Sequence, residues 1–396
     1  MMKPTYLPAI SMASVAFVFL NFGLPIRADD LGFSATAIGG TYAIFTGTVL
    51  LVRPVVGFCL DKFGRRWFFT AAFLFYVVAM TWFAFSHTLV DFYIARFLQG
   101  LGAATMWVSV RTMVADLYES ETRGEAMGKL TTTSVRGSMY GAVFGFTLLG
   151  FLPMAYAWQW AFLGYAVMAA FALFWTLFKV RETQPQLSVA EGAEASQNAE
   201  QSAEQSTDHS SEFVLAPDLK RIFVIVFFTA FASALIEPIY LIYLRNKFEV
   251  GVQLLAFVFL PSGIVFAILP KYAGRWSDQW GRAPLIAIGV VFAGLVSILL
   301  PFWPNLWLVA VSYILFSVGW AMADPAIDAI VADLSDPRFR GRVMGLLEAF
   351  AGVGAACGPL VGGYLYDNWS AVAAFCSNGV ILLMAAALTL FWFGRK

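Results

Sequence analysis

Eight charged side chains interrupt long apolar stretches of this sequence. They are Arg53, Arg96, Arg111, Arg136, Glu237, Asp324, Asp328 and Glu348. A charge at the depth of a bilayer core is costly unless an opposite charge or water stabilises it. A carboxyl group in such a place can bind and release a proton, and an arginine can pair with a carboxylate or hold an anion. These residues are therefore the candidates for proton coupling and substrate contact.

Glu237 is the first candidate for a group that titrates during function. A proline follows it directly, so we expect a broken helix there and a backbone carbonyl without its helical partner. The same acid–proline order recurs at Asp324. Two interpretations remain open. Either Glu237 takes part in proton coupling or contacts a cationic substrate, or it is a structural partner of a buried arginine such as Arg96 or Arg136. Arg136 is also a candidate for binding an anionic headgroup or carboxylate.

A second kind of charged motif lies between apolar stretches and occurs twice. Its first copy comprises Gly57, Asp61, Gly64, Arg65, Arg66 and Asp116, and its second copy comprises Gly274, Asp278, Gly281, Arg282 and Asp333. The offset from Asp61 to Asp278 is 278 − 61 = 217, and the offset from Asp116 to Asp333 is the same. The stretch around Asp61 and the stretch around Asp116 are separate in the sequence, and both repeat at the same offset. This regularity indicates two related halves.

The elements that carry these residues are predicted to be membrane-spanning helices. Hydrophobic residues make up 60% of the chain and charged residues only 13%, which is typical of a membrane protein. Runs of about 20 apolar residues span a bilayer as helix, whereas barrel strands would alternate. Twelve such runs are expected, at 6–27, 38–60, 67–87, 91–116, 126–150, 157–179, 220–244, 252–273, 284–302, 305–332, 343–365 and 371–393. The fold class is therefore all-α and polytopic, with two pseudo-symmetric six-helix bundles.

The distribution of charge predicts how the chain is oriented and divided. Most cations flank one set of loops and the C-terminus, so both termini are expected to be cytoplasmic. Residues 182–218 are rich in Glu, Gln, Ser and Ala and are expected to form a disordered cytoplasmic linker. Residues 1–181 and 219–396 would then form the two bundles. Three cysteines in apolar surroundings argue against a disulfide framework or a metal cluster, and a net charge of zero gives no sign of a nucleic-acid partner.

The whole chain resembles the major facilitator superfamily. Twelve predicted helices, a long central loop and the repeated G-x-x-x-D-x-x-G-R motif carry this resemblance. Residues 96–102 are similar to the R-x-x-Q-G-x-G motif of proton-coupled members, and residues 358–363 look like G-P-x-x-G-G. Drug–proton antiporters, the efflux permease branch that the chain resembles, usually carry the latter motif in helix five. Here the equivalent residues, 141–146, lack the proline and the second glycine.

The resemblance implies roles for both motif copies. Asp61, Arg65 and Asp116 would form a charge relay that latches the halves on the cytoplasmic side when the carrier opens outward. The second copy would use Asp278, Arg282 and Asp333. The alternative is that these cations serve only to orient the chain in the membrane.

The resemblance also points to residues of a central cavity. Helices one, four, seven and ten line it, and the halves are related by a two-fold axis along the membrane normal. Arg111 corresponds to Asp328 by the offset, so we expect an ion pair between them that forms when the cytoplasmic side closes. The alternative is that each charge reaches water separately. Six aromatic residues are candidates for lining the cavity: Tyr42, Trp107, Tyr140, Tyr240, Tyr243 and Trp320.

The expected function is secondary active transport of a small organic or amphiphilic substrate by alternating access. Proton-coupled efflux is favoured, and proton-coupled import or uniport of an organic anion or lipid-like substrate is the alternative. An enzyme is not expected, because the two histidines, His87 and His209, are far apart in the sequence. A membrane sensor that does not transport is the alternative from another class. We expect no cofactor, with a proton gradient as the driving force, and no partners other than substrate and lipid. The protein is expected to act as a monomer in the cell (inner) membrane.

Overall fold

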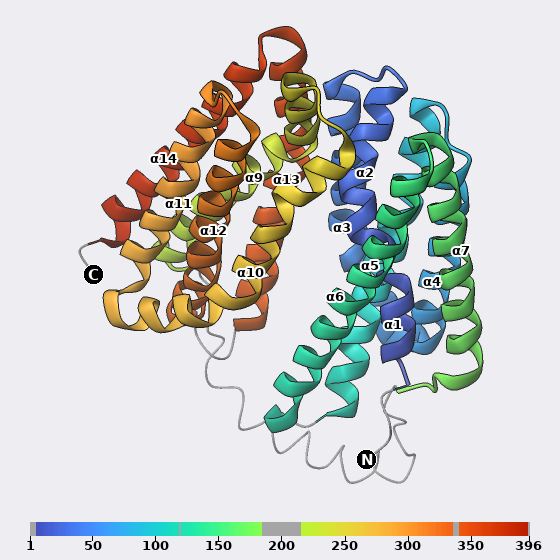
Figure 1. The fold of residues 1–396 in the computed structure, drawn as a ribbon. Coiled ribbons are helices and arrows are strands. Elements are labelled where there is room, and N and C mark those ends of the chain that lie inside the picture. The colour runs from blue at the N-terminus through green and yellow to red at the C-terminus, as the bar shows by residue number, and fades with distance from the viewer. Residues whose placement is uncertain (1–4, 119, 184–214, 336–339, 395–396) are drawn as a thin grey trace, which may run out of the picture.

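The computed structural model describes residues 5–118, 120–183, 215–335 and 340–394, and these residues form helices and short connections (Figure 1). The N-terminal half contains α1 (Leu7–Ala13), α2 (Ala16–Asp30), α3 (Ala35–Phe63), α4 (Arg66–Ala84), α5 (Leu89–Leu117), α6 (Ser120–Phe151) and α7 (Met154–Lys179). The C-terminal half contains α9 (Pro217–Phe248), α10 (Val252–Trp280), α11 (Arg282–Leu299), the 3₁₀ helix η1 (Leu300–Phe302), α12 (Leu306–Leu334), α13 (Arg340–Asn368) and α14 (Ala371–Phe393).

The helices confirm the prediction of twelve crossings. Nine spans of the described chain are long and apolar enough to cross a membrane, and the first of them combines α1 and α2. Helices α5, α6 and α10 are the three other crossings in the predicted order of twelve. They carry more polar and charged residues near the ends where the repeated motifs lie.

The two halves repeat each other in helix register. The first residues of α3 and α10 stand at the offset found in the sequence, as do those of α5 and α12, and of α7 and α14. The last residues of α6 and α13 stand at the same offset. Each half has its own apolar core, centred on residues such as Phe19 and Phe162 in the N-terminal half and Ile286 and Val290 in the C-terminal half. The offset seen in the sequence is therefore a structural repeat.

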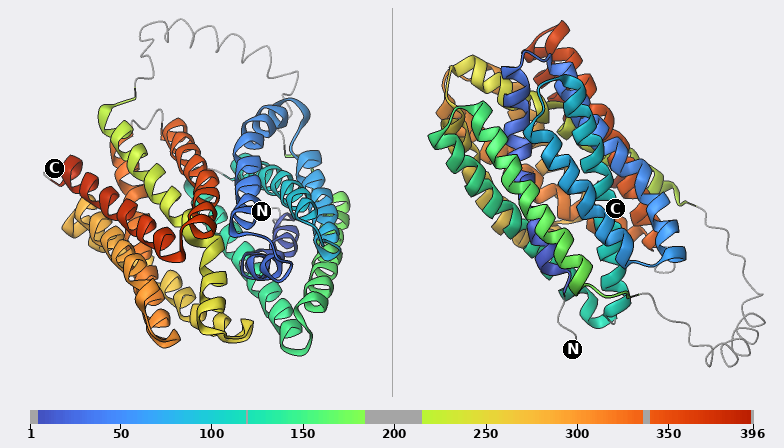
Figure 2. Two further views of the ribbon diagram at one scale, coloured as in Figure 1. Left: turned by 90° about the horizontal axis from the view of Figure 1, so that it is seen from above. Right: turned by 90° about the vertical axis from the view of Figure 1, so that its right-hand side faces the viewer.

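The halves meet mainly where α3 runs alongside α13, with smaller contacts between α2 and α9 and between α6 and α10 (Figures 1 and 2). Glycines allow the first approach, because a Cβ at Gly39 would collide with the carbonyl of Pro359, and one at Gly363 with the carbonyl of Ala35. We call the end of the bundle where α7 ends and α9 begins the linker face. The opposite end, where α2 ends and α3 begins, is the far face.

The predicted linker, residues 182–218, falls mostly outside the described residues. Its first two residues are described and hold defined positions, since Glu182 and Thr183 both make hydrogen bonds to the first motif copy. At its other end α9 already begins at Pro217. Contacts of the N-terminal bundle therefore extend to Thr183, past the boundary predicted at 181.

Candidate functional site

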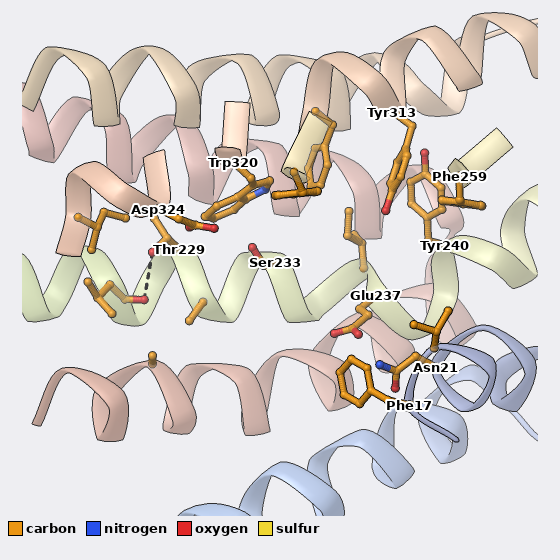
Figure 3. Close-up of a pocket in the computed structure, with 18 of the residues that line it drawn as sticks. Phe17, Asn21, Thr229, Ser233, Glu237, Tyr240, Phe259, Tyr313, Trp320 and Asp324 are labelled. Carbon is orange, nitrogen blue, oxygen red and sulfur yellow. Dashed lines mark hydrogen bonds between the residues drawn. The ribbon is translucent and has the colours of Figure 1, made fainter. Parts of the chain in front are cut away.

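A cavity of about 890 Å³ lies between the halves and is lined by α2, α9, α10, α12 and α13 (Figure 3). The ionisable residues that line it, apart from tyrosines, are four acids: Glu237, Asp324, Asp328 and Glu348. All four side chains are exposed, and the surface that they expose faces this cavity. The described lining contains no lysine, arginine or histidine. The cavity is therefore a water-accessible space of acidic character.

Aromatic rings form much of the remaining wall. Phe17 and Phe22 come from α2, Phe259 and Phe266 from α10, and Tyr313, Phe316 and Trp320 from α12, with Tyr240 from α9. Several of these rings pack on one another: Phe259 and Tyr313 meet edge to face with centroids 4.4 Å apart, and Phe22 of the other half lies 6.3 Å from Phe259. Such surfaces bind apolar and cationic groups through dispersion and cation–π attraction.

The predicted aromatic residues divide into two groups. Tyr240 and Trp320 line the cavity as predicted, whereas the other four do not. Tyr42 and Tyr243 are buried in helix packing, with their hydroxyls bonded to the backbone of Asn21 and Pro301. Trp107 packs against the N-terminal core, and Tyr140 is 69% exposed away from the lining.

Sequence reasoning missed the contribution of α2. Phe17, Asn21 and Phe22 bring the N-terminal half to the cavity, and Figure 3 shows Glu237 on the side of α9 that faces Asn21 and Phe17. Asn21 is a lone amide in an otherwise apolar run, which is a signal that could have singled it out.

Arg96 lies behind this part of the wall. Its side chain is 1% exposed and donates from Nη1 to Oε1 of Gln99 over 3.0 Å. Its guanidinium carbon lies 4.9 Å from the ring centroid of Tyr42 and 5.4 Å from that of Phe45. Glu237 lies within electrostatic range of Arg96, yet no ion pair joins them in the described chain. Arg136 is exposed on α6 and is absent from the cavity lining.

The predicted ion pair between Arg111 and Asp328 is not formed among the described residues. Arg111 Nη1 instead lies 3.4 Å from Oε1 of Glu348, and Arg53 Nη1 lies 2.8 Å from Oε2 of the same carboxylate. Both pairs join the two halves, and Asp328 stands beside Glu348 within electrostatic range. The sequence offset places Arg111 and Asp328 at equal depth. It does not reveal that α13, packed along α3, brings Glu348 between them.

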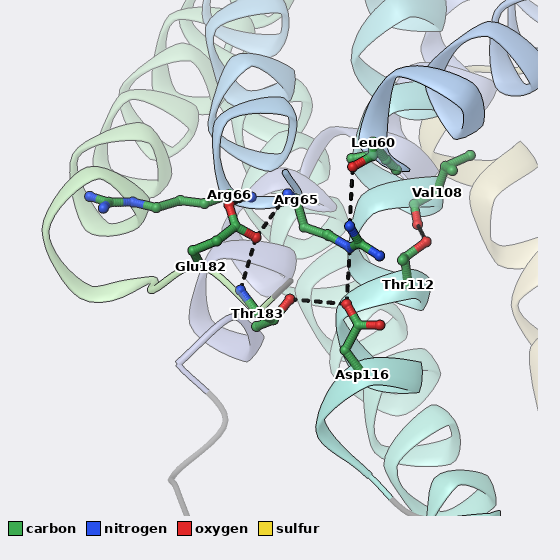
Figure 4. Close-up of polar contacts among 8 residues, drawn as sticks. All are labelled: Leu60, Arg65, Arg66, Val108, Thr112, Asp116, Glu182 and Thr183. Carbon is green, nitrogen blue, oxygen red and sulfur yellow. Dashed lines mark hydrogen bonds and ion pairs between the residues drawn. The ribbon is translucent and has the colours of Figure 1, made fainter. Parts of the chain in front are cut away.

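One relay forms within each half at the linker face, and Figure 4 shows the relay of the N-terminal half. Arg65 donates from Nε to Asp116 over 3.0 Å and from Nη1 to the carbonyl of Leu60 over 3.2 Å. Arg282 donates from Nε to Asp333 over 3.1 Å and also pairs with Asp278. These contacts confirm the predicted grouping of the arginines with Asp116, Asp278 and Asp333. The side chain of Asp61 and the surroundings of Gly274 lie outside the described residues.

Glycines set the turn in both relays. Gly64 and Gly281 have φ values of 88° and 93°, a region that side-chain-bearing residues rarely adopt. Each ends one helix and lets the next begin almost at once, which places the following arginine against the aspartate of α5 or α12. Gly57 has open space around it, so no packing requirement explains it.

Glu182 is a partner of the first relay that the sequence did not reveal. Its carboxylate accepts hydrogen bonds from the backbone N–H groups of Arg65 and Arg66 over 2.9 and 3.1 Å. Arg66 Nη2 donates to the carbonyl of Leu177 near the end of α7 over 2.6 Å. The end of α7 and the start of the linker are thus fastened to the beginning of α4. All these contacts stay inside the N-terminal half, so they do not join the halves in this conformation.

Two repeated six-helix bundles around a central acidic cavity define a membrane transport protein. The chain belongs to the Major Facilitator Superfamily, whose family model matches residues 6–221 and 222–396. It is 26% identical over 393 residues to multidrug resistance protein 1 of Bacillus subtilis (97% of this chain, 95% of that protein). It is 22% identical over 377 residues to the quinolone resistance protein NorA of Staphylococcus aureus (93% of this chain, 92% of that protein).

Solved structures show the same fold at lower identity. The xylose transporter XylE from E. coli, solved in an inward-open conformation, superposes with a TM-score of 0.72 at 15% identity, over 98% of this chain and 95% of that one. The human organic anion transporter MFSD10 superposes with a TM-score of 0.66 at 18% identity, over 98% of this chain and all of that one. Membership of this superfamily makes the protein a multi-pass membrane transporter.

Proposed function

We propose that the protein exports amphiphilic organic cations in exchange for protons. The observation that carries this proposal is the charge of the cavity: four carboxylates line it, and no basic side chain does so among the described lining residues. Opposite charges attract strongly where water is partly excluded, so a positively charged group is favoured and an anionic one is opposed. The aromatic walls would hold the apolar part of the same molecule.

Efflux is supported by similarity to proteins named for drug resistance in two bacteria. Import of an organic anion is less well supported, although MFSD10 is described as an organic anion transporter. The nearest arginines do not offer a free positive charge to an anion, because Arg53 and Arg111 are paired with Glu348 and Arg96 is buried behind Tyr42. An anion in the cavity would meet the carboxylates first.

Glu237 is the residue that we assign to proton exchange. It faces the cavity, and no salt bridge within the described part of the chain holds it permanently charged. One carboxylate that binds either a proton or a cation couples the two flows, because occupancy by one excludes the other. Arg96 would favour release of the proton by stabilising the charged carboxylate from behind the wall.

We further propose the setting in which this exchange operates. Cations such as Lys62, Arg66 and Arg275 gather at the linker face, and positive charge marks the cytoplasmic side of a membrane protein. The linker face and both termini would be cytoplasmic, with the protein in the cell membrane. The proposed unit is a monomer without a cofactor, and the proton gradient supplies the driving force.

The test uses purified protein in proteoliposomes with an acidic interior and tetraphenylphosphonium as the probe cation. We expect the proton gradient to drive uptake of this cation, and Glu237→Gln to abolish the gradient-dependent part. Glu125→Gln is the matched control, since Glu125 forms a surface pair with Lys129 away from the cavity, and it should transport normally.

Two results would contradict the proposal. One is uptake of tetraphenylborate, an anion of the same shape, in preference to the cation. The other is gradient-dependent uptake by Glu237→Gln at the rate of the parent protein.

A further inference from the structure

The carboxylate of Asp367, at the end of α13, binds the beginning of α3 in the other half of the molecule. Oδ1 accepts from the backbone N–H of Ala35 over 2.9 Å, and Oδ2 accepts from the backbone N–H of Thr36 over 2.7 Å. Oδ2 also accepts from the Thr36 hydroxyl over 2.6 Å. One side chain thus makes three hydrogen bonds across the boundary between the halves.

These bonds satisfy backbone groups that a helix leaves without partners. The first N–H groups of a helix have no acceptor inside it, and its N-terminus carries partial positive charge. The hydroxyl of Ser34 accepts from the N–H of Ala37 over 3.2 Å. Asp367 supplies the acceptors for the N–H groups of Ala35 and Thr36. The acceptors for the start of α3 therefore come from the other half. Separating the halves at the far face would leave these two N–H groups without Asp367.

A second charged contact joins the halves at the same face. Arg245 of α9 lies 2.7 Å from Asp30 and 3.8 Å from Asp29, both at the end of α2. Beside the bonds of Asp367, the backbones of α3 and α13 come so close that a Cβ at Gly363 would collide with the carbonyl of Ala35. The far face is therefore closed by packing and by two independent sets of charged contacts.

The equivalent boundary on the other side of the molecule lacks the residue that makes this contact. The sequence offset makes α6 and α10 the counterparts of α13 and α3, with Gly150 in the place of Asp367 and Val252 in the place of Ala35. Gly150 offers no side chain, and the start of α10 receives no side-chain cap from its own N-cap residue, Gly251. Helices α6 and α10 also touch over only a short length.

We propose that Asp367 is a far-face latch: its bonds to Ala35 and Thr36 hold the cavity closed on the far side and must break each time the cavity opens there. The latch acts on one boundary only, so the far face opens from the α6–α10 side first. This inference rests on alternating access by the family fold and does not depend on the proposed cation or proton.

The experiment measures the distance between the halves at the far face by spin labelling. Labels replace His87 and Phe302, which follow α4 and lie in η1 at that face, in protein whose three cysteines have been replaced. In Asp367→Asn, we expect the ratio of far-side-open to far-side-closed molecules to rise about tenfold, as expected for losing charged hydrogen bonds to a helix end. Thr36→Val removes only the hydroxyl bond and should give a smaller shift in the same direction.

Asp91→Asn is the matched control. Asp91 also lies at the far face and also makes three hydrogen bonds at a helix start, to His87 and Thr88, but all within one half. To keep His87 intact, the N-terminal label moves to Phe85 in this comparison, in the control and in its parent alike. The control should leave the ratio unchanged.

A gain-of-contact variant tests the proposal from the other direction. Gly150→Asp introduces a carboxylate at the position equivalent to Asp367, where a Cβ meets no other atom, and should lower the open fraction. The proposal is overturned if Asp367→Asn has the same distance distribution as its parent, or if Asp91→Asn raises the open fraction over its own parent as much as Asp367→Asn does. It is equally overturned if Asp367→Asn cannot be purified and neither Thr36→Val nor Gly150→Asp changes the ratio.

Discussion

The two relays at the linker face have the same core and different surroundings. In each, an arginine after a positive-φ glycine binds an aspartate on the fourth membrane span of its half, α5 or α12. In the first relay the side chains of Arg65 and Asp116 are 10% and 14% exposed, whereas those of Arg282 and Asp333 are 27% and 59% exposed. The side chains of this pair are therefore mostly covered in the first relay and more open to solvent in the second.

The first relay also has its own connection to a neighbouring helix. Glu182 and Arg66 connect it to the end of α7, and the counterpart of Arg66 is Ala283, a buried apolar residue. The arginine–aspartate pair is therefore the common unit of the repeat. The contacts to α7 are an addition that stiffens the linker face of the N-terminal half.

The largest difference should appear when each arginine is removed. Arg65→Ala leaves a poorly solvated carboxylate and should lower the free energy of unfolding by about 3 kcal/mol. Arg282→Ala breaks a solvated pair and should cost only about 0.5 kcal/mol. Thermal unfolding midpoints of the purified variants in detergent measure both. Equal losses would mean that burial does not distinguish the relays.

Glu182→Gln should have an intermediate effect. It keeps an acceptor oxygen and removes the charge that favours the start of α4, which should cost about 1 kcal/mol. Hydrogen exchange should accelerate at the amides of Arg65 and Arg66, and no amide at the start of α11 should respond. Unchanged exchange at both amides would show that the carboxylate contact does not persist in solution.

Arg66→Ala should have the smallest effect. The substitution makes the first relay resemble the second, which has Ala283 at the equivalent position. It removes one partly solvated hydrogen bond to the carbonyl of Leu177, which should lower the free energy of unfolding by about 0.5 kcal/mol. The unfolding midpoint should fall slightly, and exchange should quicken near the end of α7. A loss as large as that of Arg65→Ala would assign the main role to the contact with α7.

Much of the architecture could be predicted because membrane helices are long and the repeat is regular. The offset between Asp61 and Asp278 also relates the helix boundaries, and the relay residues meet within their halves as expected. Local spacing is enough for these features, because each relay joins neighbouring elements of one bundle.

Contacts between the halves could not be predicted in the same way. A shared offset gives Arg111 and Asp328 the same depth but does not tell which helix stands between them, and Glu348 took the expected place of Asp328. Similarly, the role of Asp367 depends on how closely α13 approaches α3, which small residues such as Gly363 decide. Glu182 was hidden for another reason, because its polar neighbourhood looks like the rest of the linker.

The position of Glu182 bears on how the two halves can be produced as separate polypeptides. A cut after residue 181, where the composition of the chain changes, would put Glu182 on the C-terminal fragment. The start of α4, which this carboxylate binds, would be on the N-terminal fragment. A cut after Thr183 keeps this residue and the bond from Thr183 to Asp116 with the bundle that they complete. The natural division of the gene for reassembly experiments therefore lies inside the polar segment, beyond its apparent beginning.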